Sequence, residues 1–193
     1  MKKKFFVIES IVYLSFIILD ILKIDASYIK YLGIVFCFLY ALINYKKYQT
    51  LSMIFTLIAD MFLLVLDKYY EIGVLSFIVV QMIYTLFIKN INDKYFKQFI
   101  LVRIVVLILG ISILYISKNL SLLNILVIIY FSNLLINTFE SYNTKNNTLS
   151  IGLTLFVCCD ICVGLHNILP QQTIASFLMW VFYLPSQVLI VLA

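Results

Sequence analysis

Long runs of apolar residues, separated by short polar breaks, fill almost the whole of this 193-residue chain. The runs have about the length that a helix needs to cross a hydrocarbon layer of about 30 Å, and they are continuous, unlike the alternating strands of a membrane β-barrel. The pattern predicts an all-α polytopic membrane protein, a bundle of eight transmembrane helices in a single integral membrane domain, 1–193. The predicted helices are Phe5–Leu22, Tyr28–Ile43, Leu51–Leu66, Ile72–Ile88, Phe99–Ile116, Ser121–Thr138, Leu149–Leu165 and Thr173–Ala193.

The composition supports this fold class. With 64% hydrophobic and 12% charged residues, the chain has too little polar surface to cover an ordinary soluble domain. The first apolar run follows three lysines, as a signal peptide would, but no small-residue cleavage site follows it and Asp20 and Lys23 close it. We therefore expect a retained first helix.

Basic residues in the polar breaks predict the orientation of the chain, because cytoplasmic loops carry an excess of Lys and Arg. One side would carry Lys2, Lys3, Lys4, Lys46, Lys47, Lys89, Lys94, Lys97 and Lys145, and the other Lys23, Lys30, Lys68 and Lys118. This asymmetry predicts that both termini are cytoplasmic. Anionic lipid headgroups then explain the net charge of +5, and no nucleic-acid partner is needed.

Two aspartates stand out, because Asp60 and Asp160 lie near the middle of two almost wholly apolar runs. A carboxylate at the centre of a spanning helix costs about 2.5–3.5 kcal/mol on insertion scales, so such a residue usually marks a functional site. Both runs leave the same face, as the third helices of two successive four-helix halves. The spacing therefore predicts similar depths and a shared site. A short similarity between Thr56–Asp60 and Thr154–Asp160 also suggests a parallel internal duplication.

Polar side chains recur at helical spacing in the neighbouring runs and predict a polar interior. The pairs are Gln81 with Thr85, Asn133 with Asn137, and Tyr183 with Gln187. Tyr130 precedes Asn133 by one helical turn. Taken singly, each pair is also explained by hydrogen bonds between helices, worth about 0.6 kcal/mol each. Gly152 and Gly164 share one helical stripe with Asp160, which predicts close approach of a neighbouring helix.

The remaining chemistry-bearing residues have simpler interpretations. Cys159 and Cys162 form a CxxC within an apolar run, and with a single histidine, His166, we expect packing rather than a metal site. Glu9 and Arg103 lie near the predicted cytoplasmic edge, where mutual pairing or snorkelling explains them.

Four parts of the chain resemble, in order, motifs of the YhhN-like family of membrane lysoplasmalogenases. Ala59–Leu64 resembles a family Gly-Asp followed by apolar residues, and Gly73–Tyr84 resembles its Gly-x-x-x-Phe-x-x-x-His-x-x-Tyr helix. Gly152–Asp160 resembles its Gly-x-x-x-Phe-x-x-Ser-Asp segment, and Tyr183 with Gln187–Ile190 its closing Tyr-rich, Gln-x-Leu-Ile helix. Eight helices are the architecture that the resemblance implies.

The chain also departs from the family pattern. Ala59 replaces the glycine, Gln81 the histidine and Cys159 the serine, and Lys30-Tyr31 stands where Lys-Pro is usual. Ala and Cys preserve small side chains, whereas Gln81 removes a titratable group.

The resemblance implies hydrolysis of the vinyl ether bond of lysoplasmalogens to a fatty aldehyde and a glycerophospho-headgroup product, without a cofactor. Asp60 and Asp160 would share one proton and supply acid and base. The lysophospholipid substrate would come from the surrounding membrane lipids. The residues expected to orient water or bind substrate are Gln81, Tyr84, Tyr130, Asn133, Tyr183, Gln187 and Lys30.

Three other interpretations remain open. A proton-coupled transporter also uses intramembrane aspartates, although the runs that hold Asp60 and Asp160 lack proline breaks. An intramembrane aspartyl protease needs two aspartates as well, but its Gly-x-Gly-Asp motif is replaced by Leu57–Asp60. A non-catalytic, lipid-binding relative is the third, because of Gln81. The composition suggests a bacterial cytoplasmic membrane as the location.

Overall fold

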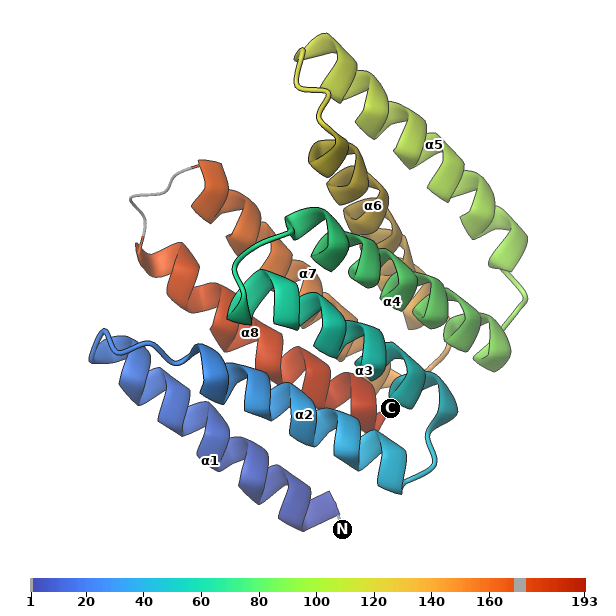
Figure 1. Cartoon of the computed structure of the whole chain (residues 1–193). Coiled ribbons are helices and arrows are strands. Elements are labelled where there is room, and N and C mark those ends of the chain that lie inside the picture. Colours follow the sequence, from blue (N-terminus) through green and yellow to red (C-terminus); the bar gives the residue numbers. More distant parts are fainter. Residues whose placement is uncertain (1, 169–172) are drawn as a thin grey trace.

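The computed structural model describes residues 2–168 and 173–193, and all of their regular secondary structure is helical. The eight predicted helices are confirmed within a few residues at each end (Figure 1). A short π-helix, η1, directly continues the third of them. The elements are α1 (Lys2–Ile21), α2 (Ser27–Ile43), α3 (Lys47–Asp60), η1 (Met61–Val65), α4 (Tyr70–Ile91), α5 (Phe96–Ile116), α6 (Leu122–Tyr142), α7 (Asn147–Ile168) and α8 (Thr173–Leu192).

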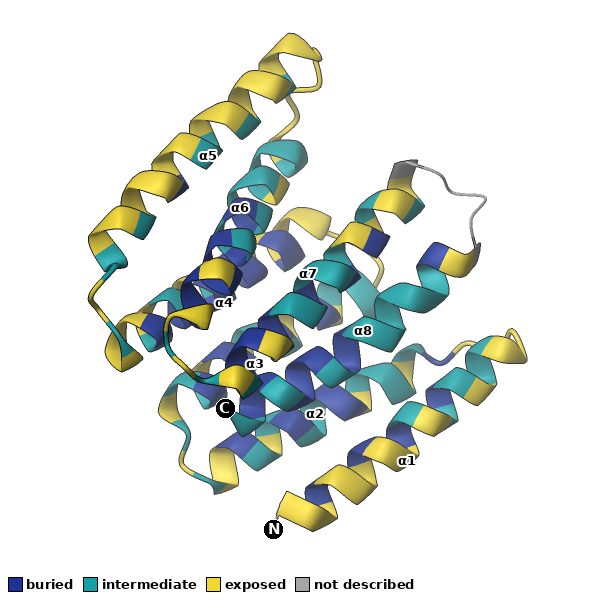
Figure 2. Cartoon of the chain, turned by 180° about the vertical axis from the view of Figure 1, so that it is seen from behind, coloured by how far each residue is buried: buried dark blue, intermediate teal, exposed yellow. Residues whose placement is uncertain are grey.

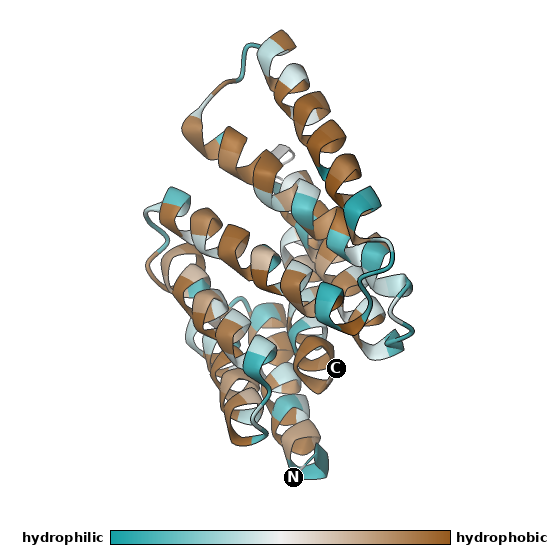
Figure 3. Ribbon diagram, turned by 90° about the vertical axis from the view of Figure 1, so that its right-hand side faces the viewer, coloured by the Kyte–Doolittle hydropathy of each residue, from teal (hydrophilic) through white to brown (hydrophobic). Residues whose placement is uncertain are grey.

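Six of the described helices are long and apolar enough to cross a membrane: α3 with η1, α4, α5, α6, α7 and α8. Apolar α2 is shorter, at 17 residues, and α1 carries several charged residues along its length. Hydrophobic residues dominate the helices in Figure 3, and the polar ones gather at helix ends and connections. The chain is therefore an integral membrane protein, and spanning by α1 and α2 stays a prediction.

Six helices form a closed ring. In the order α2, α3, α4, α6, α7 and α8, each packs against the next, and α8 returns to α2. The other two flank the ring: α1 packs on α2 and α8, and α5 packs on α6 (Figure 1). Most of α5 is exposed (Figure 2), as expected for a helix that faces lipid.

The two four-helix halves repeat the same packing. The contact of α1 with α2 corresponds to that of α5 with α6, and α2 packs on α8 as α6 packs on α4. This pattern agrees with the predicted parallel duplication. It also places α3 and α7, which carry the two aspartates, on opposite sides of the ring.

Both termini lie at one end of the bundle, here called the terminal face (Figure 1). Two loop side chains hold the last backbone carbonyls there. Lys46 Nζ, between α2 and α3, donates to the Leu192 carbonyl at 2.9 Å, and Asn146 Nδ2, between α6 and α7, donates to Ala193 O at 3.4 Å. The connections after α1, α3 and α5 lie at the opposite face. That the terminal face is cytoplasmic stays a prediction.

The two glycines on the Asp160 stripe behave differently. A Cβ on Gly152 would lie 2.9 Å from Ile190 Cγ1 and 3.1 Å from the Ile190 backbone nitrogen, which confirms the predicted close approach of α8. A Cβ on Gly164 would meet no atom of the described residues within 4 Å. The prediction for Gly164 is wrong, because α8 does not reach α7 closely at that turn.

Candidate functional site

Asp60 is the last of the 14 residues of α3, and the π-helix η1 begins at the next residue. Single π-turns inside helices are frequent at functional sites. The Asp60 side chain is 4% exposed. The Tyr183 hydroxyl, from α8, lies 2.9 Å from Asp60 Oδ1 and 2.7 Å from Oδ2 and donates to this carboxyl group. Asp60 is therefore held in place from across the ring.

Asp160 has the corresponding position in α7, where it is also the fourteenth residue. Thirteen residues at 1.5 Å each place both aspartates about 20 Å from the terminal ends of their helices, which confirms the predicted equal depth. Asp160 is half-buried, and the Tyr130 hydroxyl, from α6, faces its carboxyl group. Asp160 Oδ2 is buried and has no hydrogen-bond partner among the described residues.

The two carboxyl groups occupy one interior but are not joined directly. No hydrogen bond links Asp60 to Asp160 within the described part of the chain, so each has its own tyrosine instead of the directly shared proton that we expected. The Cys159 thiol interacts electrostatically with both of them. The two aspartates therefore form one site with two separate acidic groups.

An aromatic cluster fills the space around the two tyrosines. Phe156 lies 5.6 Å from Tyr183, 6.4 Å from Tyr130 and 5.8 Å from Phe77, between ring centroids, and Phe77 lies 5.5 Å from Tyr130. Edge-to-face pairs of this kind are favourable. The faces of aromatic rings also attract a cation.

Lys30 lies at the opposite face, near the start of α2. Its Nζ forms an ion pair with Asp20 at 2.9 Å and lies 4.8 Å from the centre of the Trp180 ring. Trp180 in turn packs edge-on against Tyr183, with ring centroids 5.5 Å apart. One cation is thus connected through two aromatic rings to Asp60.

Three further predicted residues are buried on the terminal side of the aspartates. Gln81 and Gln187 are 0% exposed and Tyr84 is 1% exposed. The Tyr84 hydroxyl faces Ser52 of α3. Asn133 is half-buried, and its Nδ2 donates at 2.8 Å to the Ile129 carbonyl of its own helix, so its place in the site stays a prediction. Asn133 was predicted from helical spacing, which does not show where a side chain finds a partner.

Sequence reasoning missed a second buried polar cluster. Arg103 Nη2 donates to Glu140 Oε2 at 2.7 Å and to Asn137 Oδ1 at 2.6 Å, and it lies 3.4 Å from Thr85 Oγ1. The expected pairing of Arg103 with Glu9 is wrong, because α1 and α5 flank different sides of the ring. The only sequence signal for a buried partner is that Arg103 lies within the apolar run Phe99–Ile116.

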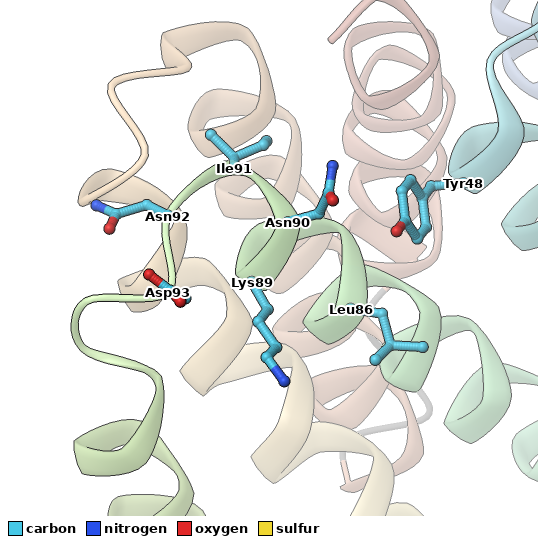
Figure 4. A pocket seen from close by; sticks show the side chains of 7 residues that line it. All are labelled: Tyr48, Leu86, Lys89, Asn90, Ile91, Asn92 and Asp93. Atoms are coloured by element: carbon cyan, nitrogen blue, oxygen red, sulfur yellow. The ribbon is translucent and has the colours of Figure 1, made fainter.

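A surface pocket of about 610 Å³ lies at the terminal face, where α4 ends (Figure 4). The predicted site residues lie elsewhere in the fold, so this pocket is separate from the aspartates. Its lining residues are Tyr48, Leu86, Lys89, Asn90, Ile91, Asn92 and Asp93.

Comparison with protein families gives one match. The model of the YhhN family matches residues 26–193, from just before α2 to the end of the chain. The comparison with curated proteins finds no significant match, and neither does the comparison with solved structures. The matched region contains both aspartates and the whole ring but leaves out α1.

Proposed function

The chain belongs to the YhhN family, and from this premise we propose that it is a lysoplasmalogenase-like hydrolase that cleaves the vinyl ether bond of lysoplasmalogens. The products would be a fatty aldehyde and a glycerophospho-headgroup alcohol. The observation that carries the proposal is the pair of carboxyl groups at equal depth, each facing a tyrosine hydroxyl of a different helix.

The reaction needs one acid and one base. Protonation of the β-carbon of the vinyl ether breaks its π bond and produces an oxocarbenium ion. Water then adds to the cationic carbon and gives up one proton, which forms a hemiacetal. The hemiacetal loses its glycerol oxygen as an alcohol and becomes the aldehyde. Two carboxyl groups, one protonated and one ionised, supply both functions, and general acid–base catalysis of this kind contributes about 10²–10⁴-fold in rate.

The surroundings of the aspartates suit the charged intermediate. The remaining carboxylate stabilises the oxocarbenium ion electrostatically, and the faces of Phe156 and Phe77 offer a second, weaker stabilisation. An apolar environment strengthens both effects, because charges interact more strongly at low dielectric. The alkyl chain of the substrate needs no polar contact and stays among apolar side chains.

Lys30 is suited to hold the phosphate of the substrate. Its ammonium group forms an ion pair with Asp20 at 2.9 Å, and a substrate phosphate would compete with this carboxylate for the same charge-assisted contacts. From Lys30, the rings of Trp180 and Tyr183 lead to Asp60. A phosphate at Lys30 therefore directs the glycerol and its vinyl ether toward the aspartates.

The test is aldehyde release from a purified lysoplasmalogen by the protein in detergent. We expect activity in the wild type and in Asp93→Asn, an exposed control, and loss of activity in Asp60→Asn and in Asp160→Asn. A folded wild type that releases no aldehyde would overturn the proposal, and so would full activity in either aspartate variant. Movement of the lipid or of protons without bond cleavage would indicate a transporter.

A further inference from the structure

Apart from Glu140 Oε1 and His166 Nδ1, five buried polar atoms on the ring helices have no hydrogen-bond partner among the described residues. Buried polar groups are nearly always satisfied by protein or by ordered water, so a cluster of such atoms on the inner side of one ring calls for a polar occupant. The atoms are Gln81 Nε2, Tyr84 Oη, Tyr130 Oη, Asp160 Oδ2 and Gln187 Oε1. We call these five residues the polar track.

The residues of the polar track lie at increasing depth from the terminal face. Counted from the terminal ends of their helices, Gln187 is about 8 Å deep, Tyr84 about 10 Å and Gln81 about 15 Å. Tyr130 lies at about 18 Å and Asp160 at about 20 Å. No step between successive residues exceeds about 5 Å along the axis.

Tyr84 shows that the track lies inside the ring. Its hydroxyl faces Ser52 of α3, and its electrostatic neighbours include Cys37 of α2 and Tyr130 of α6. Neighbours on three other ring helices surround a side chain only if it points toward the centre. A water at Tyr84 would therefore be within the ring and not in the lipid around it.

The Arg103 cluster fixes which end of the Gln81 amide faces the track. A guanidinium group only donates hydrogen bonds, so the Asn137 oxygen accepts at 2.6 Å from Arg103 and the Asn137 amide nitrogen must donate. That nitrogen lies 3.0 Å from Gln81 Oε1, which is consequently the acceptor. The Gln81 NH₂ group is left as a fixed donor for an oxygen atom.

Asp60 has a different environment. Both of its oxygens accept from Tyr183, whose ring leads by way of Trp180 to Lys30 at the opposite face. The two aspartates thus differ in the groups that surround them. The lipid side has a cation and aromatic rings, and the terminal side has neutral donors and acceptors that suit water.

We propose that water enters from the terminal face along the polar track and reaches Asp160, while the lipid reaches Asp60 from the side of Lys30. Resting on the proposed function, this assigns Asp160 as the base that activates water and Asp60 as the acid. Gln81 and Tyr84 position the water.

The assignment balances over one turnover. Asp60 gives its proton to the vinyl carbon, and Asp160 takes a proton from the water whose oxygen bonds to the cationic carbon. When the hemiacetal breaks, Asp160 returns its proton to the leaving glycerol oxygen and Asp60 takes the proton of the hemiacetal hydroxyl. Both carboxyl groups regain their initial states, so no proton has to cross the membrane.

Accessibility of introduced thiols tests the track without using enzyme activity. In a background with Cys37, Cys158, Cys159 and Cys162 replaced by Ala, we would compare Gln81→Cys and Tyr84→Cys with two controls. The controls are Met53→Cys and Leu134→Cys, which are equally buried at 0% exposure on ring helices but lie off the track. We expect a small charged methanethiosulfonate reagent to modify the track thiols at least about tenfold faster. Equal rates would overturn the proposal.

Sealed vesicles then test the direction of entry. Lys145→Cys marks the terminal face and Lys68→Cys the opposite face. The membrane-impermeant reagent should modify Gln81→Cys only from the side on which the Lys145→Cys marker reacts. Modification from the side of the Lys68→Cys marker would overturn the proposed entry of water.

Kinetics test the role of Gln81. Gln81→Leu should lower kcat by about tenfold and leave KM for the lipid unchanged, because only water positioning is lost. Gln49→Leu, buried on α3 off the track, should retain kcat. A raised KM with unchanged kcat in Gln81→Leu would overturn the assignment. If the wild type releases no aldehyde, the proposed function fails, and thiol accessibility still decides whether the water track exists.

Discussion

The two four-helix halves of the molecule have the same packing but different electrostatic partners. In each half the third helix carries an aspartate at its fourteenth residue, and the flanking helix carries one buried charged residue at its eighth: Glu9 in α1 and Arg103 in α5. Arg103 has Glu140 as its counter-ion at 2.7 Å. Glu9 has only the Cys37 thiol, at 3.6 Å from Oε1, and its Oε2 has no partner among the described residues.

For the aspartates, it is the first half in which the charged group has a hydrogen-bond partner. Asp60, in the half whose flanking charge lacks a counter-ion, accepts a hydrogen bond shared between its two oxygens from the Tyr183 hydroxyl, whereas Asp160 has an oxygen without a partner among the described residues. The duplicated arrangement therefore fixes depth and position, and the individual side chains decide which groups are held and which are open to a ligand. Equal geometry does not mean equal chemistry.

The largest expected effect is on activity at the two aspartates. Asp60→Asn and Asp160→Asn should each lower aldehyde release by about 10²–10⁴-fold, because each removes a proton-transferring group. The free energy of unfolding should change by less than about 1 kcal/mol, since asparagine has nearly the size of aspartate and its amide oxygen can accept a hydrogen bond as the carboxyl group does. Aldehyde assays and thermal unfolding in detergent measure the two effects. Large destabilisation by both variants would show that the aspartates are structural.

The next largest effect is on stability at the flanking charges. Arg103→Met should lower the free energy of unfolding by about 3–5 kcal/mol, because Glu140 is left as an unpaired buried charge. Glu9→Gln, the matched change in the other half, should cost less than about 1 kcal/mol, since no counter-ion is lost. Thermal unfolding measures both.

A double variant controls for lost packing at this site. Arg103→Met combined with Glu140→Leu should recover most of the stability, as replacement of a buried ion pair by apolar groups often does. If the double variant is no more stable than Arg103→Met alone, the loss comes from packing and not from the charge.

The two tyrosines give a smaller contrast. Tyr183→Phe should destabilise the protein by about 1–2 kcal/mol, because it removes a hydrogen bond to a buried carboxyl group. Tyr130→Phe should cost less than Tyr183→Phe, since its hydroxyl faces Asp160 without the close hydrogen bonds that Tyr183 makes to Asp60. Unfolding of both variants in one detergent makes the comparison. The same loss in both would mean that Tyr130 and Tyr183 hold their aspartates equally.

Helix positions and the depth of the aspartates could be predicted because both depend on local sequence. Apolar runs of spanning length define the helices, and the cost of an intramembrane carboxylate draws attention to Asp60 and Asp160. Helical spacing also identified Gln81 and Tyr183, which the structure places in the interior. Each of these conclusions needs only the sequence of a single helix.

Features that depend on which helices are neighbours could not be predicted. The pairing of Arg103 with Glu140 joins residues 37 positions apart, and the hydrogen bond from Tyr183 to Asp60 joins residues 123 apart. Nothing in the hydropathy pattern reveals the order of helices around the ring. For the same reason, the pairing of each carboxyl group with its own tyrosine appeared only in the structure.

The smallest expected effect concerns the packing of α7 on α8. Gly152 lies eight residues before Asp160, where the other half has Ser52 eight residues before Asp60. In Gly152→Ala, the added Cβ lies 3.1 Å from the Ile190 backbone nitrogen, and this overpacking costs about 1–3 kcal/mol. The higher helix propensity of Ala offsets about 1 kcal/mol of that cost. The variant should therefore lower the free energy of unfolding by about 1 kcal/mol. Gly164→Ala, with open space around its Cβ, should stabilise by up to about 1 kcal/mol for the same reason of propensity. A lower unfolding temperature for Gly152→Ala and a higher one for Gly164→Ala would localise the close contact of α7 with α8 to the part of α7 around Gly152. A higher unfolding temperature for both variants would show that α7 and α8 can move apart at Gly152 without cost.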